Sequence, residues 1–199
     1  MGADDAAATA APTPPAEAEI AAWITATLDG DDRAFAQLVR QFKDRILRLV
    51  ARFARNAHDL DEIAQDVFVD AHRSLAKFRA DAPFEHWLCR IATRRCQDYL
   101  RRLYRRRWWS SLEAMRETGF EPAADAPAAV DPRVDLLRTA LRRLHPDHQT
   151  ILNLLELQDC SVREAAQLTG WSESNVKVRA HRARHALRAE MEKLSARRA

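Results

Sequence analysis

The chain has 199 residues, of which 47% are apolar and 31% are charged, enough for one or two small domains. Only four glycines are present, and Ala, Leu, Arg and Glu are common, a composition that favours helix over sheet. No apolar run approaches the roughly 20 residues of a membrane span, and the acidic N-terminus lacks the apolar segment of a signal peptide. We therefore expect a cytoplasmic protein.

The net charge is only +3, but the charge is segregated along the chain. Residues 1–35 carry seven acids and one base, whereas residues 90–107 carry eight arginines and one acid. Residues 177–199 carry eight Lys or Arg and two acids. Two basic patches on a balanced chain predict two contacts with a polyanion, and nucleic acid is the expected partner. The alternative is two solvated basic helix faces.

The N-terminal part combines a disordered tail with a helical module. Residues 1–17 are rich in Ala, Pro, Thr and Asp and are expected to be disordered. Over residues 18–108, apolar residues recur at spacings of three and four, which predicts a series of amphipathic helices. A short loop at 79–83 interrupts this pattern, and Pro83 suits the first turn of the next helix.

The C-terminal part begins after a change of composition. Residues 109–132 contain prolines, a glycine and scattered acids without a sustained period, which indicates a flexible linker whose start can carry a short helix. The helical pattern resumes over 133–194, and residues 195–199 form a short tail. The predicted fold is all-α, with two small helical domains joined by a flexible linker.

The stretch AAQLTGWSESNVKVRAHRAR, residues 165–184, predicts a helix-turn-helix. Ser161 and Glu164 form a capping box that starts the first helix, Gly170 suits a turn with positive φ, and Ser172 can cap the second helix. Trp171 would fill the corner between the helices. Such a second helix could place basic side chains in a major groove, whereas the alternative is an ordinary helical hairpin with a basic face.

The segment from residue 59 to residue 107 changes from acidic, through aromatic, to basic. Aromatic rings beside arginines suit single-stranded nucleic acid, because bases stack on rings while arginines hold the backbone. For Phe68 and Phe78 we expect a core position instead, and for Trp87 both interpretations remain open. The acidic start is expected to face solvent or a basic protein surface.

Residues 32–108 and 133–191 resemble regions 2 and 4 of bacterial sigma-70 family RNA polymerase sigma factors, most closely the short extracytoplasmic-function (ECF) type. The resemblance lies in DDRAFAQLV, DLDEIAQDVFVDAHRSLAKF, PFEHWLCRIATRRCQDYLRR and SVREAAQLTGWSESNVKVRAHRARHAL. It implies a protein that adds promoter recognition and strand opening to core RNA polymerase. It also implies an inhibitory anti-sigma factor, and a protein that is a monomer when free of partners.

The resemblance further implies roles for individual residues. Five residues of region 2 are implied to dock on the β′ clamp helices of the polymerase: Asp61, Glu62, Gln65, Asp66 and Phe68. Region 4 is implied to contact the β flap. The residues implied to contact the −10 element are Lys77, Arg79, Phe84, Trp87, Arg90, Arg94, Arg95, Arg101 and Arg102. Those implied to contact the −35 element are Ser174, Asn175, Lys177, Val178, Arg179, His181, Arg182 and Arg184.

Four positions depart from the family pattern. Arg94 stands where the family has asparagine, Val178 and Ala180 where it often has polar or larger residues, and Asp159 where it usually has glycine. The short linker and the opposite charges also allow a closed form of the free protein, with the acidic linker or the N-terminus lying on the basic faces.

The remaining reactive residues give weak indications. Cys89, Cys96 and His86 could share a helix face, but a zinc site would need a fourth ligand, so small buried thiols are the favoured interpretation. No phosphate-binding glycine loop or nucleophile–base pair is evident, and neither an enzyme nor a cofactor is expected. Two rival functions remain: a stand-alone helix-turn-helix regulator, and a sigma-like protein that binds core polymerase without opening promoters.

Overall fold

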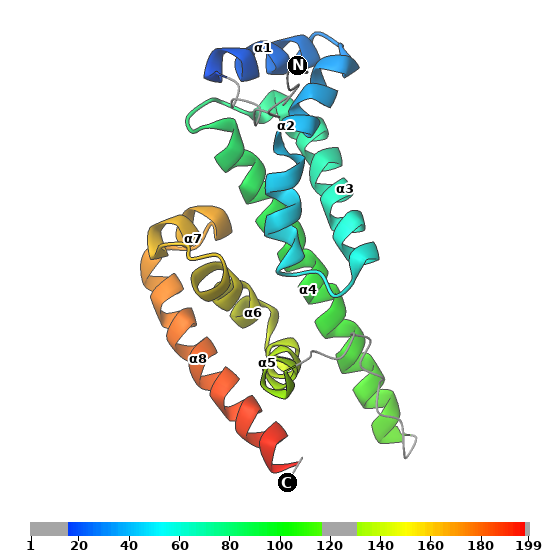
Figure 1. Ribbon diagram of the computed structural model, residues 1–199, viewed down its shortest axis with the longest axis vertical. Helices are drawn as coiled ribbons and strands as arrows, with labels where there is room; N and C mark the ends of the chain where they lie inside the picture. The colour runs from blue at the N-terminus through cyan, green and yellow to red at the C-terminus, as the bar shows by residue number, and fades with distance from the viewer. Residues whose placement is uncertain (1–15, 117–130, 198–199) are drawn as a thin grey trace, which may run out of the picture.

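The computed structural model describes residues 16–116 and 131–197, and within these ranges every regular element is helical. The elements form two units, one on each side of residues 117–130 (Figure 1). The predicted all-α fold with two helical units is confirmed. Within the described residues, no helix is long and apolar enough to cross a bilayer.

The first unit contains four α-helices and one short 3₁₀ turn. Asp31 and Asn56 cap the second and third helices by accepting hydrogen bonds from the main-chain N–H groups of Arg33 and Asp59. These caps satisfy amide groups that have no partner inside the helix. The elements are α1 (Glu17–Leu28), α2 (Asp32–Ala51), α3 (Ala57–Ser74), η1 (Leu75–Lys77) and α4 (Phe84–Arg116).

The core of the first unit lies where α2, α3 and α4 meet. Ile46, Val67 and Ala92 are fully buried there, at residues where the apolar spacing placed the inner face of each helix. Helix α1 packs on α2 and adds Ile24 to the same cluster. The result is a single core that fixes the direction of the long helix α4.

The second unit consists of α5 (Pro132–Arg143), α6 (Pro146–Leu152), the π-helical stretch η2 (Asn153–Leu157), α7 (Val162–Thr169) and α8 (Glu173–Ala196). Its core is formed mainly by small and branched apolar residues. Ala165, Val176 and Ala183 are fully buried. Alanines at the contact allow α7 and α8 to approach closely, which a helix-turn-helix requires.

Two predicted boundaries fall at the edges of the described residues. Helix α4 continues to Arg116, beyond the expected end of the first module at 108. The rest of the expected linker lies mostly in 117–130, outside the described residues, as do residues 1–15 of the expected tail.

The two units contact each other along α4. Helices α6 and α7 pack against α4, which extends as the long green helix beside the second unit in Figure 1. The guanidinium of Arg107 donates hydrogen bonds of 2.7 and 2.8 Å to the main-chain carbonyls of Arg142 and Arg143. Leu168 of α7 packs against the core of the first unit. The arrangement is closed through contacts of α4 with α6 and α7, whereas the N-terminal tail and most of the linker, which were expected to cover the basic faces, lie outside the described residues.

Candidate nucleic-acid and polymerase interface

The turn between α7 and α8 has the local structure predicted from its sequence. The main-chain N–H of Ser161 donates to the Glu164 carboxylate at 2.8 Å, and the N–H of Glu164 donates to Ser161 Oγ at 3.2 Å. Gly170 has φ of 75°, and Ser172 Oγ accepts from the N–H of Asn175 at 3.3 Å. The predicted capping box, turn glycine and second cap are all confirmed.

Helix α8 has one buried face and one cationic face. Val176, Ala180 and Ala183 are buried against the second core. Nearly all the residues expected to contact the −35 element are exposed on the other side: Ser174, Asn175, Lys177, Val178, His181, Arg182 and Arg184. Arg184 pairs with Glu156 at 2.7 Å, but more than half of its side chain remains exposed. The face is available to a ligand.

Arg179 is the exception among these residues. It forms an ion pair with Asp147 of α6, and its Nε donates a hydrogen bond of 2.7 Å to Asn175 Oδ1. Its guanidinium also lies 4.4 Å from the centre of the Trp171 ring. Trp171 therefore fills the corner, as predicted, and also supports an arginine by a cation–π contact.

Sequence analysis did not identify Asp147. This acid pairs with Arg179 and also lies 3.6 Å from Arg101 on α4. It stands in an ordinary Pro-Asp helix start, so no local pattern distinguishes it. Packing of α6 against α8 within the second unit gives it Arg179, and packing of the two units gives it Arg101.

The basic residues expected to contact the −10 element differ in their ion pairs. Lys77, Arg79, Arg90 and Arg94 are exposed, with the first two at the turn before α4. The others are on α4 and pair with acids: Arg95 with Asp70, Arg101 with Asp98 and Asp147, and Arg102 with Glu62. The hydrogen bond from Arg95 to Asp70 raises the pKa of that guanidinium.

Phe84 lies in an aromatic cluster and is only 6% exposed. Its ring centre is 5.3 Å from that of Phe42 and 5.4 Å from those of Phe78 and Trp87. Trp87 is half-buried at the edge of this cluster. Phe78 and Phe84 thus pack together on the two sides of the 79–83 loop in sequence, and Trp87 presents one side to the groove between the units.

A groove of about 920 Å³ separates the two units on this side. Five cations line its α4 side, namely Lys77, Arg79, Arg90, Arg94 and Arg101. Gly170 and Trp171, at the helix-turn-helix corner, line the other side. The second unit therefore narrows the approach to the basic face of the first unit.

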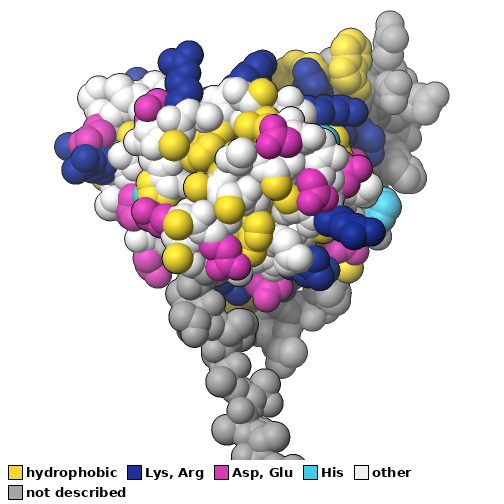
Figure 2. All heavy atoms as spheres, turned by 90° about the horizontal axis from the view of Figure 1, so that it is seen from above, with side chains coloured by type: hydrophobic (Ala, Val, Ile, Leu, Met, Phe, Trp, Pro, Cys, Tyr) yellow, Lys and Arg dark blue, Asp and Glu magenta, His cyan; other side chains and the backbone are white. Residues whose placement is uncertain are grey.

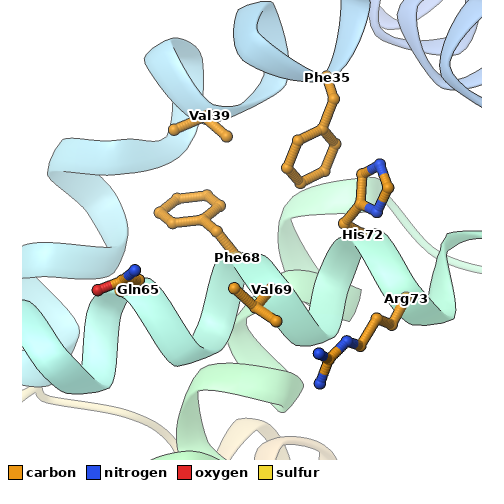
Figure 3. A pocket seen from close by; sticks show the side chains of 7 residues that line it. All are labelled: Phe35, Val39, Gln65, Phe68, Val69, His72 and Arg73. Carbon is orange, nitrogen blue, oxygen red and sulfur yellow. The ribbon is translucent and has the colours of Figure 1, made fainter. Parts of the chain in front are cut away.

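The acidic start of the first module forms a separate surface on α3. Asp61, Glu62 and Gln65 are exposed, and Asp66 and Phe68 are half-buried. Beside them, α2 and α3 form an open, largely apolar pocket of about 410 Å³. In Figure 3 the Phe68 ring points from α3 towards Phe35 and Val39 on α2.

Sequence reasoning did not place five of the lining residues at this site. They are Phe35, Val39, Val69, His72 and Arg73, which line the pocket together with Gln65 and Phe68. The sequence signal for this pocket was Val69, because it follows Phe68 directly and extends the apolar stripe of α3 beyond the core; in the structure it is exposed.

At the α1 end of the molecule, acidic and basic side chains lie interspersed among apolar ones (Figure 2).

The cysteines lie where the favoured interpretation put them. Cys89 and Cys96 are buried, and Cys160 is half-buried. Burial raises the pKa of Cys89 to about 11 and also raises the pKa of Cys96, so both thiols stay protonated and poorly nucleophilic near neutral pH. Among the described residues, no three His, Cys, Asp or Glu side chains gather as metal ligands.

Comparisons with known proteins agree with both units. The family model described as Sigma-70 region 2 matches residues 38–107, and that described as Sigma-70, region 4 matches residues 135–187. The ECF RNA polymerase sigma factor SigM of Mycobacterium tuberculosis is 34% identical over 161 residues, which cover 81% of this chain and 79% of that protein. The ECF RNA polymerase sigma-E factor of Escherichia coli is 30% identical over 166 residues, covering 79% and 86%.

Two solved structures have a similar fold. CnrH, in complex with the cytosolic domain of CnrY, is 28% identical with a TM-score of 0.56, over 89% of this chain and 97% of that chain. The sigma factor RpoE of Bartonella quintana, in complex with the anti-sigma factor NepR, is 19% identical with a TM-score of 0.53, over 79% and 96%. At 19% identity the second likeness shows the fold alone.

Proposed function

The chain belongs to the ECF group of the sigma-70 family of RNA polymerase sigma factors, and from this we propose that it binds core RNA polymerase, recognises a promoter at two elements and opens the strands. The observation that carries the proposal is the separation of an acidic surface from the cationic surfaces. An exposed acidic row lies on α3, and cationic faces lie on α4 and α8. A protein with this role acts in the cytoplasm through binding alone, without chemistry of its own.

The acidic row on α3 is the proposed docking site for core polymerase. Asp61 and Glu62 are exposed and can meet a basic partner, whereas Phe68 and the adjacent pocket offer an apolar anchor. Acids around an apolar depression suit a helical partner with both basic and apolar side chains. We assign this surface, together with Gln65 and Asp66, to the β′ clamp helices, and region 4 to the β flap.

The turn before α4 and the outer face of α4 are the proposed −10 contacts. Lys77, Arg79, Arg90 and Arg94 can hold phosphates, and the outward side of Trp87 can stack on a base. Opening a base pair costs a few kcal/mol, which stacking and phosphate contacts can offset. Because Phe84 is buried, its contribution is to hold the loop and Trp87 in place.

Helix α8 is the proposed −35 contact. Its exposed N-terminal half carries polar and basic side chains, which suits insertion into a major groove. Arg179 can join them when it leaves Asp147. Because Asp147, the hydrogen bonds of Arg107 and the packing of Leu168 hold the two units together, the free chain is a closed monomer that must open to span two promoter elements.

We also propose regulation by an anti-sigma factor. The solved structure of RpoE from Bartonella quintana contains such a partner. A protein that binds the closed form would stabilise it by mass action and keep the DNA-binding faces apart from promoter DNA.

The deciding experiment is binding of the purified chain to core RNA polymerase. We expect Asp61→Arg/Glu62→Arg to lose binding, because charge reversal opposes a basic partner. Asp44→Arg is the matched control, since Asp44 is an exposed acid on α2 outside the row. Tight binding of the chain alone to duplex DNA, with no binding to core, would instead identify a stand-alone helix-turn-helix regulator. Core binding without opening of any promoter would identify a sigma-like interaction protein.

A further inference from the structure

Two adjacent tryptophans near the end of the described part of α4 are unusually exposed. Trp108 is 60% exposed and Trp109 is 65% exposed, more than any other large apolar side chain among the described residues. Both lie beyond residue 107, where the region 2 family model ends. They contribute to neither described core, so packing does not explain them, and exposed aromatic pairs on soluble proteins usually mark binding surfaces.

The spacing of residues along α4 places these rings on the proposed −10 face. From Trp87, the residues Arg90, Arg94, Arg101, Arg105 and Trp108 follow at intervals of 3, 4, 7, 4 and 3. Such intervals keep side chains on one face of an α-helix. Trp109 lies on the other edge of the same stripe, so the two rings flank the row of arginines. The stripe from Trp87 to Trp109 is about 33 Å long at 1.5 Å per residue.

The charges along this stripe favour a polyanionic ligand. Arg90, Arg94 and Arg105 are exposed, and the acid within the stripe, Asp98, is already paired with Arg101 at 3.2 Å. The contacts between units leave the tryptophans open: Arg107 and Tyr104 face the second unit, through the carbonyls of Arg142 and Arg143 and through the ring of His145.

We propose that Trp108 and Trp109, with Arg105 and Arg106, form a stacking platform that binds single-stranded promoter DNA at the far end of the −10 face. Aromatic rings beside cations are the combination that binds unpaired nucleic acid with little sequence preference, because every base has a π face. A bilayer surface is the weaker fit, because a row of arginines runs along the centre of the stripe and only two apolar rings flank it. The proposal rests on the proposed function and extends the strand-opening surface beyond the region matched by the family.

The test uses the full chain assembled with core RNA polymerase and a labelled single-stranded oligodeoxynucleotide, with the same sequence as a duplex for comparison. We expect Trp108→Ala/Trp109→Ala to weaken single-strand binding about tenfold or more, since base–aromatic stacking is lost. Binding to the duplex should change less than threefold. Trp108→Phe/Trp109→Phe should retain most of the single-strand affinity, because Phe can also stack.

Two controls separate this proposal from the proposed function. Core binding is measured first for every variant, and Leu28→Ala, at a 53% exposed apolar residue of α1, should leave all affinities unchanged. If the native chain does not bind core, the proposed function fails, and single-strand binding is then measured on the chain alone. Core binding with equal single-strand affinity for native and Ala variants overturns the platform. Loss of binding to phosphatidylglycerol vesicles alone, with single-strand affinity intact, overturns it in favour of a membrane contact.

Discussion

The carboxylate of Asp147, on α6, lies 3.6 Å from the guanidinium of Arg101, on α4. The same carboxylate pairs with Arg179 of α8. One acid thus joins an arginine of the proposed −10 face to an arginine of the proposed −35 face. The Asp147 side chain is only 15% exposed, whereas that of Arg101 is 46% exposed. Asp147 is therefore held in place, whereas the exposed guanidinium of Arg101 can leave this carboxylate and bind a DNA phosphate instead.

Removal of this charge is expected to loosen the closed arrangement. Asp147→Asn keeps the shape of the side chain but weakens both ion pairs, so both arginines become free to bind DNA. We expect a larger radius of gyration of the free chain in small-angle scattering, and an affinity for duplex DNA that is roughly threefold to tenfold higher. Glu156→Gln is the control, because it frees Arg184 within the second unit alone. Unchanged scattering and DNA affinity would contradict the role assigned to Asp147.

Phe84 is expected to contribute more to the stability of the first unit than to direct contact with DNA. Phe84→Ala removes a ring that contacts Phe42, Phe78 and Trp87, and we expect a loss of about 3 kcal/mol in the free energy of unfolding, measured by urea denaturation. Trp87→Ala, at the edge of the cluster, should cost less. Native-like stability of Phe84→Ala, together with a loss of promoter opening, would show that the ring leaves the core to contact DNA.

Local features were predictable because they depend on residues close in sequence. The capping box of Ser161 and Glu164, the turn at Gly170 and the cap at Ser172 each involve atoms within about four residues, and each was found as predicted. The apolar spacing likewise identified the buried faces of α2, α3 and α8, since helical periodicity links sequence position directly to a face.

Features that join distant segments were not predictable in the same way. The partners of Arg95 and Arg179 lie 25 and 32 residues away in sequence, and no local pattern marks Asp70 or Asp147 as those partners. Phe84 falls on the apolar stripe expected for its helix, and the resemblance assigns it to the −10 contacts, but neither identifies Phe42 and Phe78 as the rings that pack around it. This packing depends on how α2, α4 and the turn after η1 meet, which a single sequence does not specify.

Asp159 has a main-chain conformation that favours glycine. Its φ is 51°, in the left-handed region, at a position where the family usually has glycine. Asp tolerates this region better than most residues, but its Cβ still costs free energy there. We expect Asp159→Gly to raise the free energy of unfolding by about 0.5 kcal/mol, and Asp159→Val to lower it by about 1 kcal/mol or more. Urea denaturation measures both, and the opposite order would show that the side chain of Asp159 contributes more than its backbone strain costs.

The capping box is expected to make the stability of the second unit depend on pH. Hydrogen bonds from the Ser161 hydroxyl and main-chain N–H lower the pKa of Glu164 below its ordinary value of 4.5. A carboxylate with a depressed pKa contributes stability above that ordinary value, and the contribution is lost as the pH falls through the folded pKa. Because Glu164 is exposed, solvent screens the effect and keeps it small.

Glu164→Gln keeps an oxygen that can accept both hydrogen bonds but does not titrate. We expect the native chain to be the more stable of the two at pH 7, and the difference to shrink at an acid pH below the folded pKa of Glu164, where the carboxylate becomes protonated. Urea denaturation at both pH values measures the difference, and Glu192→Gln, an exposed glutamate of α8 outside the box, should show no such dependence. A difference that stays constant with pH would mean that the shape of the box, and not the charge on Glu164, stabilises the start of α7.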